Sequence, residues 1–336
     1  MMGGRADGVS ATTARIMELL KKPHGHYLSG QELSRHLGIS RAAVWKHITA
    51  LRRMGYAIEA LPARGYRFSS STCPYNALEI ASGLTTKVIG RPIHFHEEVA
   101  STNEIAFTMA KESAPEGTAV VANRQSAGKG RLGRQWESPP DGGIYTSIIL
   151  RPAISPREAP KLSLLAAVAV AEAVGGFLSH PPTVKWPNDL LIQGKKVAGV
   201  LAEMNAEMDR INFIVIGVGV NVNVKSGGEV FSPEVQAIAT SLSAVEGVEI
   251  SRVALLQALF GKVEEWYNRF LRDGFMPVRE AWNRYSGMAG RRVTVRQIGA
   301  AFDGTVLGID EDGALLVKEE RGIVTRVTDG DVVVGR

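Results

Sequence analysis

Three patterns of hydrophobic and polar positions follow one another along the chain. Apolar residues at helical spacing fill the first part, and apolar strands alternate with long apolar helices in the middle. Short β-branched runs separated by Gly and Asp turns fill the last part. A period near 3.6 residues predicts helices, and short runs bounded by turn residues predict strands. The patterns therefore predict an α+β protein of three domains, at residues 1–70, 71–287 and 288–336.

The first domain has the order helix, short helix, turn and helix. Apolar spacing over residues 16–20 predicts the first helix, and a capping box at residues 29–32 (SGQE) begins the second. Ser40 is placed to cap the third helix, and two short strands are expected at residues 56–60 and 65–68. This order predicts a winged helix-turn-helix, in which the third helix enters the DNA major groove.

Positive charge is concentrated in the same domain. Residues 1–75 hold eleven Lys and Arg against four Asp and Glu, whereas the remainder holds 28 against 30, within a total net charge of +5. A basic module joined to a near-neutral body indicates nucleic-acid binding, and the alternative is a helical adaptor with a solvated basic face. The expected DNA contacts are Ser40, Arg41, Trp45, Lys46 and Arg64.

A basic glycine-rich loop, GKGRLGR at residues 128–134, follows an apolar strand expected at residues 118–123. The loop satisfies GxGxxG, but it runs into residues 135–143, which cannot form the helix that a dinucleotide-binding fingerprint requires. Its three cations can instead donate charge-assisted hydrogen bonds to phosphate oxygens, while the glycines allow close backbone approach. A surface loop that happens to be basic is the alternative interpretation.

Two further motifs lie downstream. VKWPND at residues 184–189 places Lys185 at a strand end, and GVGVNVN at residues 217–223 closes an apolar strand at residues 211–216. Glycines there would let a flat ligand lie against the backbone, and Asn221 offers a donor and an acceptor. Each motif alone also has a structural explanation in packing or in turn formation.

Together with Ser101, Thr102 and Asn103, these motifs resemble, in their order, those of the biotin–protein ligases. With the basic helix-turn-helix in front, the chain is similar to the bifunctional members of that family, which also repress the biotin operon. The resemblance covers essentially all 336 residues. It implies a mixed-sheet α/β ligase domain of the biotin/lipoate ligase type between the winged helix-turn-helix and a small SH3-like β-barrel.

The resemblance implies a two-step, ATP-dependent reaction. Biotin's carboxylate would attack the α-phosphorus of ATP, giving biotinyl-5′-AMP and pyrophosphate, with Mg²⁺ accompanying the ATP and its ligands unknown. A specific lysine of the biotin carboxyl carrier domain of acetyl-CoA carboxylase would then attack the mixed anhydride. In the first step the biotin carboxylate must approach the triphosphate, and both are anions. This step therefore requires cations more than it requires a nucleophile from the enzyme.

The resemblance also assigns residues to roles. Lys185 and Arg131 would be catalytic. Biotin would be bound by Ser101, Thr102, Asn103, Gln125, Gly128, Lys129, Gly130, Arg131 and Lys185. The nucleotide would be bound by Arg131, Arg134 and Asn221. The family commonly has Arg where Lys129 stands, and lysine keeps the charge but lacks the bidentate fork.

Two other functions stay open. One is a DNA-binding sensor of an acyl-adenylate without ligase activity, against which the intact Lys185 and Arg131 argue. The other is a lipoate-type ligase, which a winged helix does not usually precede. In the leading interpretation, biotinyl-adenylate is also a corepressor that favours a homodimer bound to operator DNA.

Composition limits the remaining possibilities. A single cysteine excludes an intramolecular disulfide and a thiolate zinc site, and no signal segment is visible. We therefore expect a cytoplasmic protein with no membrane partner.

Two further segments have simple interpretations. The most apolar stretch, residues 162–178, is expected to be a buried helix. His94 and His96 share one face of an expected strand, but no third metal ligand is identifiable.

Overall fold

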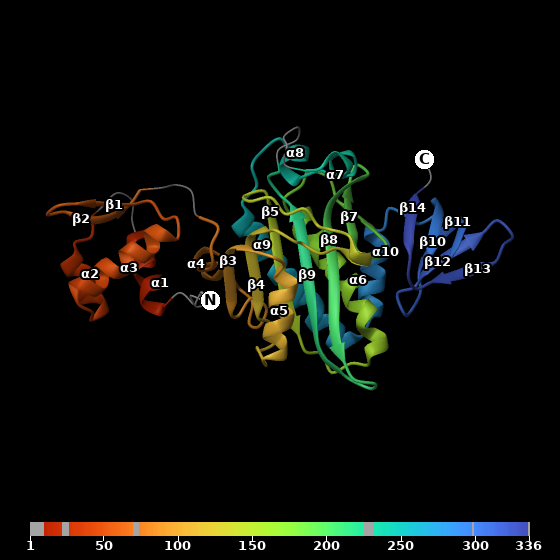
Figure 1. Ribbon diagram of the computed structural model, residues 1–336, viewed down its shortest axis with the longest axis horizontal. Helices are drawn as coiled ribbons and strands as arrows, with labels where there is room; N and C mark the ends of the chain where they lie inside the picture. The colour runs from red at the N-terminus through yellow and green to blue at the C-terminus, as the bar shows by residue number, and fades with distance from the viewer. Residues whose placement is uncertain (1–9, 22–26, 70–73, 225–230, 298, 335–336) are drawn as a thin grey trace. The chain divides into compact units, whose positions relative to one another are not determined.

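A computed structural model describes residues 10–21, 27–69, 74–224, 231–297 and 299–334 (Figure 1). The chain divides into two compact units, Met1–Gly83 and Leu84–Arg336. The first domain boundary, expected between residues 70 and 71, falls outside the described residues. The first unit also contains helix α4 (Ala77–Ser82). Glu79 of α4 accepts hydrogen bonds from Tyr56 at 2.6 Å and from Lys21 at 2.5 Å, so α4 packs with the first unit.

The first unit has the predicted helix-turn-helix order with a two-stranded hairpin. Its elements are α1 (Ala11–Lys21), α2 (Gly30–Leu37), α3 (Arg41–Arg53), β1 (Ile58–Leu61) and β2 (Gly65–Phe68). The capping box at Ser29 and Glu32 is present, and the Ser40 hydroxyl accepts from the Ala43 N–H at 3.1 Å. Gly38 lies in the left-handed region at φ 65°, which ends α2 and permits the turn. The inward positions Val44, Ile48 and Leu51 are buried, as predicted.

The second unit is built on a mixed seven-stranded sheet in the order β3-β4-β5-β9-β8-β7-β6. The strands are β3 (Ile93–Val99), β4 (Ala119–Gln125), β5 (Gly143–Leu150), β6 (Thr183–Lys185), β7 (Asp189–Ile192), β8 (Lys195–Ala206) and β9 (Ile211–Asn221). Only β3 and β4 pair in parallel; the other neighbours are antiparallel. The sheet is therefore the mixed sheet that the family resemblance implied.

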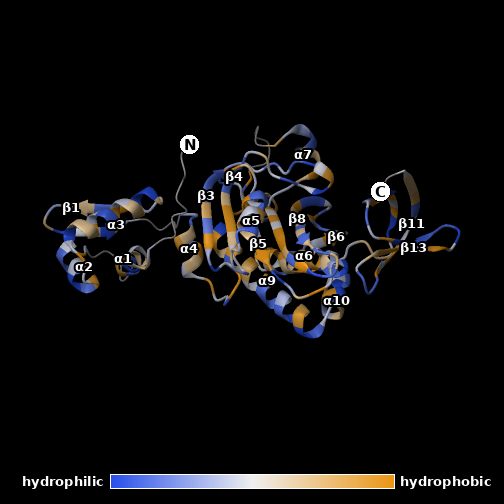
Figure 2. Ribbon diagram, turned by 60° about the horizontal axis from the view of Figure 1, so that its bottom comes forward, coloured by the Kyte–Doolittle hydropathy of each residue, from blue (hydrophilic) through white to orange (hydrophobic). Residues whose placement is uncertain are grey.

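Helices cover both faces of this sheet (Figures 1 and 2). Helix α5 (Thr102–Lys111) packs on one face through a cluster of Ala106, Ala110, Val120, Ile149, Phe213 and Val215. Helices α6 (Ala159–Gly175) and α9 (Arg252–Asp273) pack together on the other face, and α10 (Met276–Tyr285) contacts both. Three-residue turns η1 (Arg131–Gly133) and η2 (Pro156–Glu158), and helices α7 (Pro233–Ile238) and α8 (Leu242–Glu246), lie in the connections.

The buried helix expected at residues 162–178 is α6, which begins and ends about three residues earlier. Pro160 lies in the first turn of α6, where its missing N–H costs nothing, so the helix begins before the apolar run. Within the described ranges, no helix combines the length and the apolar character that crossing a membrane requires. Trp266 and Phe270 of α9 are core residues, 3% and 4% exposed, as expected.

The last segment forms the predicted antiparallel sheet, in the order β13-β12-β11-β10-β14. Its strands are β10 (Arg292–Gln297), β11 (Ala300–Ile309), β12 (Leu315–Glu319), β13 (Val324–Val327) and β14 (Asp331–Val334). Alternate residues such as Val293 and Val295 are buried. We call residues 288–334 the C-terminal sheet domain. The predicted α+β fold of helix-turn-helix, mixed sheet and small antiparallel sheet is thus confirmed.

Candidate functional site

A cavity of about 530 Å³ opens where β6, β7, β8 and β9 approach the loop that follows β4. Small-molecule sites commonly have volumes of about 300–1,000 Å³. The cavity brings together most of the residues selected from the sequence, namely Ser101, Thr102, Asn103, Gln125, Lys129, Gly130, Arg131, Arg134, Lys185 and Asn221. Gly128 is not among the residues that line it.

The glycine-rich loop is a compact loop that is closed by its own backbone hydrogen bonds. The Gly130 N–H donates to the Arg134 carbonyl at 2.7 Å, and the Trp136 N–H donates to the Gly128 carbonyl at 2.8 Å. A Cβ at Gly128 would lie 2.4 Å from the Trp136 carbonyl oxygen, so this approach requires glycine. The loop contains one 3₁₀ turn and no α-helix after it, as predicted.

Each of the three loop cations has a carboxylate partner. The pairs are Lys129 with Glu104 at 2.7 Å, Arg131 with Asp329 at 2.9 Å, and Arg134 with Asp331. The hydrogen bond to Glu104 raises the pKa of Lys129 above its ordinary value. Two of the three carboxylates belong to the C-terminal sheet domain, which therefore reaches the rim of the cavity.

At one end of the cavity, Thr102 and Gln125 form a fixed polar pair. The N–H and hydroxyl of Thr102 donate to the Gln125 amide oxygen at 2.8 and 3.1 Å. The Gln125 amide nitrogen donates to the Ser138 hydroxyl at 2.9 Å, and the hydroxyl oxygens of Ser147 and Thr102 lie 2.7 Å apart. Ser101 precedes α5 without a side-chain capping bond and is 2% exposed.

Asn103 is held equally firmly beside this pair. Its amide nitrogen donates to Glu203 at 2.7 Å, and its amide oxygen accepts from Ser147 at 2.5 Å. A Cβ at Gly217 would lie 2.1 Å from that amide oxygen, so Asn103 occupies the space that this glycine leaves. Both ends of the Asn103 amide are thus already hydrogen-bonded within the protein.

Lys185 ends β6 and lies opposite Asp189 in the β6–β7 pairing. The Asp189 carboxylate makes its ion pair with Lys196 instead, at 2.7 Å. Among the described residues, Lys185 has no carboxylate within ion-pair distance. Its positive charge is therefore available to a ligand in the cavity.

The side chain of Trp136 fills the middle of the cavity wall. A Cβ would lie 2.5 Å from this ring if built at Gly219 and 3.0 Å if built at Gly199. Lys196 lies over the ring, 5.2 Å from its centroid. The indole Nε1 is buried, and no described residue accepts a hydrogen bond from it. Trp136 therefore lines the cavity with an aromatic ring, while its N–H lies buried against β9.

The glycine motif at residues 217–223 begins inside a strand. Its first five residues belong to β9, which continues to Asn221, whereas the sequence placed the end of the strand at residue 216. Gly217 and Gly219 line the cavity, and a Cβ at either position would meet Asn103 or Trp136, so these glycines make room for side chains of the protein. The sequence does not reveal these contacts, because the side chains come from distant segments.

Asn221 at the end of β9 is 3% exposed and has one free polar atom. Its amide nitrogen donates to the Thr240 carbonyl at 3.1 Å, while its amide oxygen has no partner in the described part of the chain. A buried acceptor without a donor costs free energy, and a ligand with an N–H group would remove that cost.

Sequence reasoning missed several residues of the site. Ser147 and Glu203 orient the polar pairs, Lys196 covers Trp136, and the C-terminal sheet domain contributes Arg296, Asp331, Val332 and Val333. Ser147 had a local signal, because it is a polar residue inside the otherwise apolar run at residues 143–150. The others have no signal within their own segments.

The remaining candidates lie elsewhere. Arg41, Trp45, Lys46 and Arg64 are exposed on the first unit, and Ser40 uses its hydroxyl to cap α3. His94 and His96 are half-buried on β3, and burial lowers the pKa of both below the ordinary value. No group of three or more His, Cys, Asp or Glu side chains that could hold a metal occurs in the described ranges.

Comparison with known proteins identifies the class to which this fold and site belong. Family patterns match residues 12–67 (HTH domain), 96–221 (Biotin/lipoate A/B protein ligase family) and 289–335 (Biotin protein ligase C terminal domain). The structure is similar to the biotin protein ligase from Aquifex aeolicus in complex with biotin and ATP, with a TM-score of 0.62 and 29% identity. That similarity covers 73% of this chain and 99% of the other.

Two curated relatives match nearly the whole chain. The bifunctional ligase/repressor BirA of Bacillus subtilis is 40% identical over 95% of this chain and 98% of its own length. The protein of the same name from Escherichia coli is 31% identical, over 92% of this chain and 93% of its own. The chain belongs to the biotin protein ligase family, in the branch that carries an N-terminal helix-turn-helix, and the resemblance drawn from the motifs is confirmed.

Proposed function

We propose that the protein activates biotin with ATP to biotinyl-5′-AMP, transfers biotin to a lysine of a biotin carboxyl carrier domain, and represses transcription when the adenylate is bound. The observation that carries the first part is the cavity itself. Its lining includes Thr102, Gln125 and Asn103, which hydrogen bonds within the protein hold in place, and the four cations Lys129, Arg131, Arg134 and Lys185. A carboxylate and a triphosphate brought together there would meet a surplus of cations.

Lys185 is the proposed catalytic cation. The nucleophile of the first step is the biotin carboxylate, so the protein needs no nucleophile of its own. The ammonium group would reduce repulsion between the two anions and stabilise the negative charge that develops at the α-phosphate. The other lysine of this wall, Lys196, is neutralised by Asp189, which favours Lys185 for the role.

The loop arginines are proposed to bind phosphate by exchanging partners. Arg131 and Arg134 pair with Asp329 and Asp331, and a phosphate would offer them oxygens of greater charge in the same geometry. Arg131 would hold the adenylate phosphate and limit its escape. The Lys129–Glu104 pair would order the start of the loop.

The biotin ring would lie against Trp136, near the Thr102–Gln125 and Asn103–Glu203 pairs. The Trp136 ring would give the biotin ring an apolar surface to lie against. Because the Asn221 amide nitrogen is already bonded to Thr240, Asn221 presents only its oxygen. An acceptor matches the exocyclic amino group of adenine, which supports Asn221 as the adenine contact.

Mg²⁺ is proposed to enter with the triphosphate. Magnesium commonly keeps several waters and binds one or two carboxylates together with substrate phosphates. The ion would supply charge neutralisation on the phosphates.

The repressor activity is proposed for the first unit. Helix α3 exposes Arg41, Trp45 and Lys46, and the β1–β2 hairpin exposes Arg64, which is the arrangement of a recognition helix with a wing. Binding of a palindromic operator requires two copies, so the adenylate-bound protein is proposed to be a homodimer. The single cysteine supports a reducing, cytoplasmic location.

The deciding experiment incubates the full chain with biotin, Mg-ATP and a purified carrier domain, and weighs the carrier by mass spectrometry. We expect the mass of one biotin to be added, and we expect Lys185→Ala to reduce the rate by at least about 10²-fold. Pyrophosphate release without carrier modification would instead mean an adenylate sensor. Modification with lipoate but not biotin would mean a lipoate-type ligase, and an active Lys185→Ala variant would remove the central assignment.

A further inference from the structure

Trp186 joins the proposed catalytic lysine to the C-terminal sheet domain. It follows Lys185 directly and is 3% exposed. Its indole Nε1 donates to the Gly313 carbonyl at 3.1 Å, and its backbone N–H donates to the Met288 sulfur at 3.2 Å. Both acceptors belong to residues 288–334, so the residue after Lys185 is held from outside its own sheet.

The strand that carries Lys185 is short and lies at the edge of its sheet. Strand β6 contains only three residues, Thr183–Lys185, and it is the edge of the seven-stranded sheet. It pairs along one side with β7, and Val184 forms an isolated bridge with Ser286 on the other. A three-residue edge strand opens more easily than a central one, so its end needs support from elsewhere.

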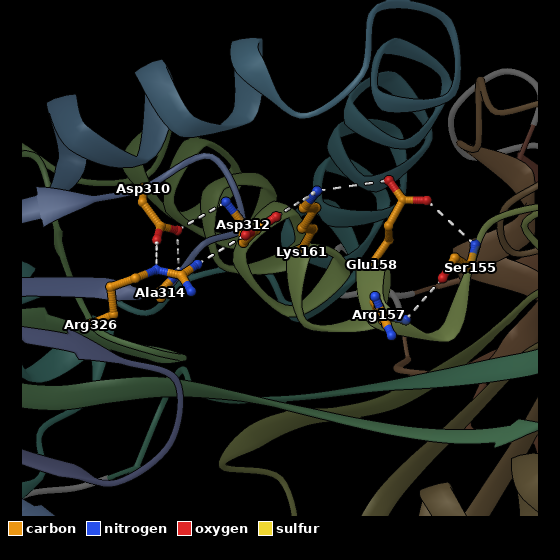
Figure 3. Close-up of polar contacts among 8 residues, drawn as sticks. All are labelled: Ser155, Arg157, Glu158, Lys161, Asp310, Asp312, Ala314 and Arg326. Carbon is orange, nitrogen blue, oxygen red and sulfur yellow. Dashed lines mark hydrogen bonds and ion pairs between the residues drawn. The ribbon is translucent and has the colours of Figure 1, made fainter. Parts of the chain in front are cut away.

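The turn that accepts the indole hydrogen bond is rigid (Figure 3). The Asp310 carboxylate accepts the N–H groups of Asp312 and Ala314, both at 2.9 Å. Arg326 closes the turn from β13, donating to Asp310 at 2.5 Å and to Asp312 at 2.9 Å. The position of the Gly313 carbonyl is therefore set by four hydrogen bonds within the C-terminal sheet domain.

The same turn is also fastened to the ligase core. Lys161 of α6 lies 3.7 Å from Asp312 and 3.8 Å from Glu158, and its side chain is only 13% exposed (Figure 3). Gly313 has φ 86°, and a Cβ there would lie 2.5 Å from Leu164 of α6. The turn therefore packs on α6 and also accepts the hydrogen bond from the Trp186 indole. In this way it connects α6 to the residue that follows Lys185.

We propose that the C-terminal sheet domain positions Lys185 for the reaction through the hydrogen bond from the Trp186 indole to the Gly313 carbonyl. Trp186 also lines the cavity, but its proposed role is that of a positioning residue, since it acts through Lys185. The inference rests on the proposed role of Lys185 in adenylate formation. It gives the C-terminal sheet domain a part in the first chemical step, besides its contribution to the cavity wall.

The test is the substitution Trp186→Phe in the full chain, which keeps an aromatic ring and removes only the N–H donor. Trp282→Phe is the matched control, because Trp282 is fully buried and its indole N–H has no partner among the described residues. Pyrophosphate release with biotin and Mg-ATP gives kcat and KM for both variants. We expect Trp186→Phe to lower kcat about five- to tenfold, with both KM values within about twofold of wild type, which corresponds to one hydrogen bond of about 1 kcal/mol.

A double-mutant cycle with Lys185→Arg separates positioning from a general loss of structure. If Trp186 acts through Lys185, Trp186→Phe slows the Lys185→Arg enzyme less than it slows wild type. Equal effects of the two Trp→Phe variants, a loss confined to KM, or full additivity with Lys185→Arg would each overturn the inference. A wild-type protein that releases no pyrophosphate would overturn the proposed function and this inference together, whereas an active wild type with an unaffected Trp186→Phe overturns the inference alone.

Discussion

At the scale of single residues, the cavity depends on glycines that make room for side chains. Gly217, Gly199 and Gly219 admit Asn103 and Trp136, so the strands β8 and β9 can lie directly beneath polar and aromatic groups. Gln125 and Asn103 are fixed through both ends of their amides before any ligand arrives. Such prior fixation lowers the entropy cost of binding, because fewer side chains remain to be ordered.

Gly219→Ala tests this use of glycine. The added methyl group would lie 2.5 Å from the Trp136 ring, so the indole must move out of its position in the cavity wall. We expect the KM for biotin to rise by about tenfold or more, because the surface that the ring offers is lost. Steady-state pyrophosphate release measures this KM.

Gly261→Ala is the control for that substitution. Gly261 lies inside α9, and a Cβ there meets no atom within 4 Å. Alanine in a helix interior is favoured over glycine, so the control should gain about 0.5–1 kcal/mol of unfolding free energy with unchanged KM. An unchanged biotin KM in Gly219→Ala would show that Trp136 does not line the biotin site.

At the scale of elements, two ion pairs join the glycine-rich loop to the C-terminal sheet domain, at and just before β14. Arg131 and Arg134 from the loop meet Asp329 and Asp331 from the C-terminal sheet domain. These side chains are substantially exposed, and exposed ion pairs contribute about 0–1 kcal/mol each. These two ion pairs are therefore weak enough for a phosphate to replace the carboxylates.

Asp331→Asn should consequently improve nucleotide binding. The substitution removes a competitor for Arg134, so we expect the KM for ATP to fall by up to about fivefold. The difference from wild type should shrink at high salt, since screening weakens exposed pairs. Glu311→Gln changes an exposed carboxylate of the same domain outside the cavity and should leave this KM unchanged. A higher ATP KM in Asp331→Asn would mean that the carboxylate assists the nucleotide.

The sequence predicts those features of the structure that arise from interactions between residues close together in the chain. The caps at Ser29 and Ser40 and the apolar faces of α1 and α3 were predictable, because the groups involved lie within one or two turns. The loop cations and Lys185 were found through motif and family resemblance. Glu203 and Gly313 were not found, because their roles arise only when strands far apart in sequence meet Asn103 and Trp186.

At the scale of the whole molecule, the chain joins a DNA-binding unit to a ligase unit. We expect operator affinity to rise with saturating biotin and Mg-ATP, because an adenylate that favours the dimer brings two recognition helices to one palindrome. A coupling of about 1–3 kcal/mol corresponds to roughly 5–150-fold tighter binding.

Fluorescence anisotropy with labelled operator DNA, at fixed salt, measures this change. Arg41→Ala should weaken DNA binding at every ligand concentration without altering pyrophosphate release, since Arg41 is exposed on α3 in the other unit. Operator affinity that does not respond to biotin and ATP would remove the regulatory part of the proposal and leave the ligase part intact.

The participation of Asp331, Val332 and Val333 in the cavity wall has a consequence during protein synthesis. The ribosome makes the helix-turn-helix first and these residues long after Ser101, and at about 5–20 residues per second the interval lasts tens of seconds. A nascent chain that has not reached β14 carries a DNA-binding unit and a cavity that lacks one wall. Adenylate synthesis would therefore require residues 331–333 to have left the ribosome and folded, so a nascent chain would neither consume biotin nor carry a corepressor.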